Sequence, residues 1–87
     1  MKITVIRSGG FAGLRRTWTV RVEDQQDRES WRKLVDGLPW NDRRPAPPQP
    51  DRYVYLIRVS RRRITLQEQQ VDGPWRELVE RVKAAAG

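Results

Sequence analysis

Residues 37–51, GLPWNDRRPAPPQPD, hold five of the six prolines in this chain of 87 residues. Proline lacks a backbone donor and fixes φ, so this run can neither continue a helix nor pair inside a sheet. Its proline-rich half should be extended and stiff. Connections of this length are unusual in a small domain and are usually functional or disordered. Regular structure must therefore come from the two stretches that flank this segment.

The first stretch predicts two strands and a helix. Residues 2–7 and 14–22, KITVIR and LRRTWTVRV, alternate polar and apolar residues and are rich in β-branched types, which is typical of strands. In residues 23–38 the apolar positions recur at helical spacing, and Gly37 is a natural stop near the end.

The second stretch repeats this order. Residues 52–60 and 62–67 read as strands, and residues 74–86 read as an amphipathic helix with Pro74 in its first turn. The two helices share the pattern Trp-Arg-x-Leu-Val-x, in WRKLVD at Trp31 and WRELVE at Trp75. Six residues are few, so the pattern fits either two related ββα halves or two amphipathic helices that converged on it.

These elements predict a single α+β domain over residues 1–87, with the order ββαββα. A four-stranded antiparallel sheet with both helices on one face would bury the tryptophans of the helices. If each helix runs back along the sheet, three connections lie at the end where the first strand finishes. They are the glycine-rich hairpin RSGGFAG, the segment 37–51 and the acidic connection EQQVDG at residues 68–73. Loops gathered at one end are the better candidate for a working surface.

The residue types argue against an enzyme. The chain has no histidine and no cysteine, which removes the commonest general base, the commonest zinc ligand and every disulfide. Ser8, Ser30, Ser60 and the threonines have no evident base beside them. We therefore expect no catalytic site, no cofactor and no intrinsic metal site.

Charge and hydropathy limit the classes of partner that the protein can bind. Lys and Arg number 18 against 11 Asp and Glu, a formal net charge of +7, which favours acidic partners. No apolar run reaches the ~20 residues of a membrane span, and the N-terminus lacks the apolar stretch of a signal peptide. We expect no membrane partner, a cytoplasmic location and a monomer when the protein is free.

Nucleic-acid binding is the alternative to a protein partner. Arginines would line strands and turns, and Trp40 and Phe11 could stack on bases. These arginines are Arg7, Arg15, Arg16, Arg21, Arg58, Arg61, Arg62 and Arg63. They fall on both ends and both phases of the strands, and no recognition motif accompanies them. Nucleic acid is therefore the weaker partner class.

Protein binding fits the apolar loop residues better. Phe11, Leu38 and Trp40 are large apolar groups on loops that have no evident core to enter. Such residues, flanked by glycine and proline, suit insertion into a partner's pocket, and a stiff loop loses less entropy on binding. The alternative is that Phe11 and Trp40 fold back over the edge of the core.

Several motifs together resemble the emfourin family, small bacterial inhibitors of protealysin-like metalloproteases of the thermolysin group. The most specific is RSGGFAG between a strand and a strand that carries a tryptophan. Leu38-Pro39 after the first helix and DRYVY at residues 51–55 also match, as do Glu68 and Leu78-Val79. The family has an apolar pair before Leu-Pro, and this chain has Asp36-Gly37 instead. Trp40 and Phe11 are therefore the better candidates for the apolar contact with the protease.

The resemblance implies an inhibitor whose neighbouring loops block the protease, with an aspartate directed to the catalytic zinc and apolar residues in substrate subsites. The candidate protease-binding loop residues are Ser8, Gly9, Gly10, Phe11, Ala12, Gly13, Leu38 and Trp40. The candidate ligands to the protease zinc are Asp51 and Asp42, ranked ahead of Glu68 and Asp72.

Overall fold

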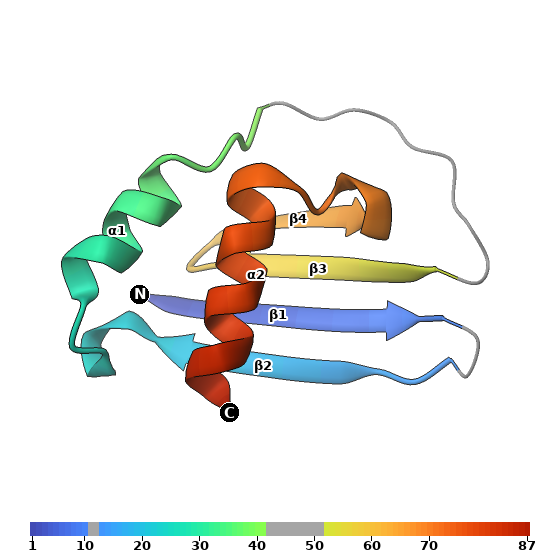
Figure 1. Cartoon of the computed structure of the whole chain (residues 1–87), viewed down its shortest axis with the longest axis horizontal. Coiled ribbons are helices and arrows are strands. Elements are labelled where there is room, and N and C mark those ends of the chain that lie inside the picture. Colours follow the sequence, from blue (N-terminus) through green and yellow to red (C-terminus); the bar gives the residue numbers. More distant parts are fainter. Residues whose placement is uncertain (11–12, 42–51) are drawn as a thin grey trace.

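Two layers, a sheet and a pair of helices, make up the part of the chain that the computed structural model describes, which is residues 1–10, 13–41 and 52–87 (Figure 1). The predicted α+β fold and the order ββαββα are confirmed. The elements are β1 (Lys2–Gly9), β2 (Arg16–Arg21), α1 (Arg28–Asp36), β3 (Tyr53–Val59), β4 (Arg62–Gln67) and α2 (Gly73–Ala86), with short 3-10 turns η1 (Val22–Asp24) and η2 (Glu68–Gln70).

The strand order in the sheet is symmetric. The strands lie in the order β2-β1-β3-β4, and each neighbouring pair is antiparallel. The first strand of each predicted half therefore lies in the centre, and the second strand of each half forms an edge. This arrangement is what two ββα halves related by a twofold rotation would produce.

One face of the sheet carries the core, because side chains alternate between the two faces of a strand. Alternate residues of all four strands are buried on the face that the helices cover. They are Ile3, Val5, Trp18, Val20, Tyr55, Ile57, Val59, Ile64 and Leu66. The helices bury Trp31, Trp75, Leu78, Val79 and Val82 against this face. The residues of the opposite phase, such as Thr4, Thr19 and Arg58, remain exposed or half-buried. Both helices therefore lie on one side, as the sequence predicts.

Trp31 links the two helices. Its indole is 1 % exposed, and its Nε1 donates a hydrogen bond to Asp27 Oδ1 at 3.0 Å. The guanidinium of Arg81, on α2, lies 5.3 Å from the centre of the Trp31 ring and donates to Ser30 Oγ at 2.8 Å. The short helix α1 is thus held against α2 by one buried aromatic and one arginine.

The start of the long connection does not lie where the topology argument places it. Arg62 opens β4 at the end of the sheet opposite the glycine hairpin, and its guanidinium lies 5.5 Å from the centre of the Trp40 ring. The reason is the length of α1. Its nine residues rise only about 13 Å, whereas the eight residues of β1 span roughly 27 Å. Figure 1 shows α1 beside the N-terminal end of β1, so it cannot return the chain to the hairpin end.

Leu78→Ala should reveal how much of the stability rests on this single core. The side chain is fully buried, so its truncation should cost about 2–5 kcal/mol of unfolding free energy. The matched control is Leu14→Ala, since Leu14 is 72 % exposed and should cost less than ~0.5 kcal/mol. Urea unfolding measures both values, and equal losses in the two variants would contradict the assigned core.

Candidate functional site

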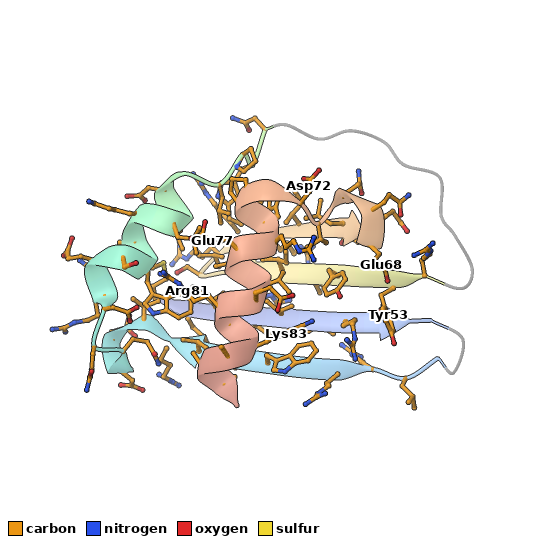
Figure 2. All side chains as sticks on the ribbon, viewed as in Figure 1. Tyr53, Glu68, Asp72, Glu77, Arg81 and Lys83 are labelled. Atoms are coloured by element: carbon orange, nitrogen blue, oxygen red, sulfur yellow. The ribbon has the colours of Figure 1, made fainter. Side chains whose placement is uncertain are left out.

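Three connections are joined by hydrogen bonds at the end of the sheet where β1 finishes. The backbone N–H of Gly10 donates to the carbonyl oxygen of Arg52 at 3.2 Å. Arg52 Nη1 donates to Glu68 Oε2 at 3.0 Å, and the other oxygen of Glu68 accepts from the backbone N–H of Tyr53 at 3.2 Å. The hairpin, the residue that leads into β3 and the connection after β4 therefore form one surface. Figure 2 shows Tyr53 and Glu68 together at this end.

The glycines of the hairpin have distinct structural roles. Gly9, Gly10 and Gly13 have φ values of +88°, +74° and +64°, a region that residues with a side chain rarely adopt. A Cβ atom on Gly9 would lie 3.2 Å from the carbonyl oxygen of Arg52, and one on Gly10 would lie 2.7 Å from Cε1 of Tyr53. A Cβ atom on Gly13 would meet nothing within 4 Å. Gly9 and Gly10 thus let the hairpin pack closely on the start of β3, whereas Gly13 serves only the turn.

Leu14, directly after the glycines of the hairpin, is an exposed residue that the sequence analysis did not single out. It is 72 % exposed and is the exposed large hydrophobic residue of the described chain. The sequence predicts a strand over residues 14–22, in which residue 14 would be in phase with the buried Trp18 and Val20. That boundary is wrong, because β2 begins at Arg16, whose partner Arg7 is the last paired residue of the β1–β2 ladder. Beyond that pair the sheet no longer directs Leu14 to the core.

The remaining predicted residues of the hairpin divide into two groups. Ser8 is half-buried within β1, where it pairs with Val54 of β3. Phe11 and Ala12 lie outside the described residues, so whether Phe11 is displayed stays a prediction.

Leu38 and Trp40 do have a core to enter, contrary to the sequence expectation. Leu38 is 6 % exposed and belongs to the main hydrophobic cluster. Trp40 packs edge-on against Trp75, with 5.1 Å between ring centres and an interplanar angle of 89°. Both residues follow the short helix α1 and close the core on the β4 side. Neither is on the surface that the hairpin forms.

The four candidate zinc ligands fall into three situations. Both carboxylate oxygens of Glu68 already accept hydrogen bonds within the chain. Asp72 is exposed just before α2, and its backbone carbonyl accepts from Trp75 N at 3.1 Å, while its side chain makes no capping bond. Asp42 and Asp51 lie outside the described residues, but Asp51 directly precedes Arg52 in the sequence.

Comparison with known proteins decides the family. The family model described as Emfourin matches residues 5–83, which is most of the chain and includes the glycine hairpin. This chain belongs to the Emfourin family. The match confirms the resemblance first seen in RSGGFAG. No curated protein and no solved structure matches the chain.

Membership of the Emfourin family makes this chain a metalloprotease inhibitor and not an enzyme. Within the described residues, no group of three or more acidic side chains is placed to hold a metal ion. Neither helix among those residues has the length and hydropathy of a membrane span.

Alanine substitutions in the hairpin test the structural roles assigned to Gly10 and Gly13. Gly13→Ala should cost about 1 kcal/mol, because only the positive φ opposes a side chain there. Gly10→Ala should cost about 2 kcal/mol or more, since the Tyr53 ring must also move. Thermal or urea unfolding of the two variants measures the difference. An equal loss of unfolding free energy in the two variants would show that a side chain at residue 10 does not clash with the Tyr53 ring.

Proposed function

We propose that this protein blocks the active site of a thermolysin-like zinc protease with the surface formed by the glycine hairpin, residues 8–14, and the neighbouring connections. The observation that carries the proposal is the exposure of Leu14 on that surface. A large apolar side chain left in water on a hairpin would be removed from water if it entered a partner's pocket. Thermolysin-like proteases favour large apolar residues beside the cut, so Leu14 or Phe11 would occupy such a subsite.

The fixed base of the hairpin supports this function. Gly10 is hydrogen-bonded to Arg52, and Glu68 holds both Arg52 and the start of β3. A surface held by contacts of this kind loses little conformational entropy when it docks. Leu38 and Trp40 are left out of the proposed contact because they pack on the core.

A carboxylate would complete the blockade. A catalytic zinc site has three protein ligands and an open position for water. A carboxylate from the inhibitor can take that position, which removes the water nucleophile and offers no peptide bond to cut. Glu68 is a poor choice because its oxygens are engaged within the chain. We propose Asp51, which adjoins Arg52 in the sequence, ahead of Asp42 and Asp72.

Nucleic-acid binding gains no specific observation in its favour. Arg58 and Arg63 face each other on the open side of the sheet, whereas Arg7 and Arg16 lie on the helix side near the hairpin. These four described arginines therefore lie on opposite faces and do not form one continuous track for a phosphate backbone.

An inhibition assay with a protealysin-like protease tests the proposal. The purified protein should inhibit stoichiometrically and remain uncleaved, and Leu14→Ala should raise the inhibition constant roughly 10-fold or more. Phe11→Ala should weaken the complex as well, without loss of folding. The matched control is Leu56→Ala, the same truncation on the open face of the sheet, which should leave inhibition unchanged. Absence of inhibition by the unmodified protein at micromolar excess would exclude the function.

Replacing each acid by its amide separates the candidate zinc ligands. Asp51→Asn should raise the inhibition constant roughly 100-fold, because an amide is a much weaker zinc ligand than a carboxylate. Asp42→Asn and Asp72→Asn serve as matched controls. Glu68→Gln should instead lower the melting temperature while inhibition at low temperature is retained. If Asp51→Asn inhibits normally and Asp72→Asn does not, the assignment moves to Asp72.

A further inference from the structure

Three cations surround one indole ring beside the hairpin. The guanidinium carbons of Arg7 and Arg16 lie 5.3 Å and 5.0 Å from the centre of the Trp18 ring, and Lys83 Nζ lies 5.1 Å from it. Arg7 is also 4.3 Å from the centre of the Tyr53 ring. We refer to these five residues as the Trp18 cluster. Figure 2 shows Tyr53 and Lys83 on the helix side of the sheet, toward the hairpin from α2.

The positive charge of the Trp18 cluster is largely uncompensated. All three cationic groups lie within 5.3 Å of one ring centre, so they lie within about a Debye length of each other at 0.1 M salt. Within the described part of the chain, Lys83 alone of the three has a carboxylate partner, Glu80 at 4.0 Å. Arg7 and Arg16 form no ion pair with any residue described in the structure. Like charges this close repel each other unless an anion joins them.

Among the described residues, no neighbouring group supplies that anion to Arg7 or Arg16. Tyr55 lies opposite Arg7 in the sheet and could in principle ionise. Burial raises the pKa of the Tyr55 phenol above its usual value of 10.0, an effect that hydrogen bonding to Arg7 only partly offsets. The phenol is therefore neutral at physiological pH. Of the two described acids nearby, Glu80 lies beside Lys83, and Glu68 is engaged by Arg52 and the backbone of Tyr53.

The stacking prepares the two guanidinium groups for a ligand. A guanidinium ion held over an aromatic ring keeps N–H donors at its edge, and although Arg7 is hydrogen-bonded to the Tyr55 phenol, its other donors can meet a carboxylate. Arg7 is half-buried between two rings, and Arg16 is exposed on one of them. Little side-chain entropy remains to be lost when an anion binds to Arg7.

We propose that Arg7 and Arg16 bind a carboxylate side chain on the rim of the target protease's active-site cleft. This inference rests on the function proposed above, since the Tyr53 ring that stacks on Arg7 also packs against Gly10 of the hairpin. A protease whose cleft receives the hairpin would bring its rim over the Trp18 cluster. A carboxylate matches the planar fork of arginine. A nucleic-acid backbone would need a longer track of cations than this compact cluster offers.

The experiment compares inhibition constants at low and high salt for three arginine variants. Arg16→Gln should weaken inhibition roughly 10-fold at low ionic strength, and the loss should shrink at about 0.5 M NaCl because salt screens the contact. Arg7→Lys keeps the charge but loses the planar fork, so inhibition should weaken several-fold while the salt dependence remains. The matched control is Arg63→Gln, which removes the same charge from an exposed site on the open face. It should inhibit like the unmodified protein, and melting curves verify that each variant is folded.

Each outcome has a distinct meaning. If the unmodified protein does not inhibit, the proposed function and this inference fall together. If it inhibits and Arg16→Gln cannot be distinguished from Arg63→Gln at any salt concentration, only the carboxylate site is overturned. If Arg16→Gln leaves inhibition unchanged but abolishes binding of a single-stranded oligonucleotide, the cluster is a phosphate site and the inference is wrong. If Arg7→Lys alone is misfolded, Arg16→Gln decides the question, because Arg16 is exposed.

Discussion

A single covered face of the sheet is the constraint on which the rest of this structure depends. Four strands and two helices share one core, and α2, with three fully or nearly fully buried side chains in Leu78, Val79 and Val82, takes its centre. The shorter helix α1 lies to one side, near the N-terminal end of β1 (Figure 1). The opposite end of the sheet is therefore left without a helix above it. Aromatic and charged side chains occupy that end, and the hairpin rises from it.

The glycine hairpin illustrates how one motif can carry two functions. Gly9 and Gly10 are required by the close approach of the backbone to Arg52 and Tyr53, which is a packing requirement. Gly13 has open space around it and permits the turn that leaves Leu14 in solvent. Gly9 and Gly10 thus fix the base of the hairpin, and Gly13 leaves Leu14 exposed beside it. Close packing and the turn both require glycine within a few residues of each other, which makes the sequence of this hairpin distinctive.

Most of the fold could be predicted from the sequence, because the decisive patterns lie within single elements. Alternation in residues 2–7 and helical spacing around Trp31 and Trp75 depend only on neighbours in the chain. The predictions that failed are those that depend on the length of one element relative to another. The place of Trp40 depends on the rise of α1 compared with that of β1, and the exposure of Leu14 depends on where the β1–β2 ladder stops. The Trp18 cluster depends on the register that sets Arg7 opposite both Arg16 and Tyr55. Register follows from the exact length of the hairpin, which residue types alone do not specify.

The symmetric strand order has a consequence for survival beside a protease. Local opening of a sheet starts where backbone groups are least protected, which is at edge strands and chain ends. Here the hairpin joins the central strand β1 to the edge strand β2, and Arg52 leads directly into the central strand β3. The amides of the two central strands should be the last to exchange with solvent. The side of the proposed surface that β1 and β3 hold should therefore stay folded longest beside a protease, whereas the side next to Leu14 depends on the edge strand β2.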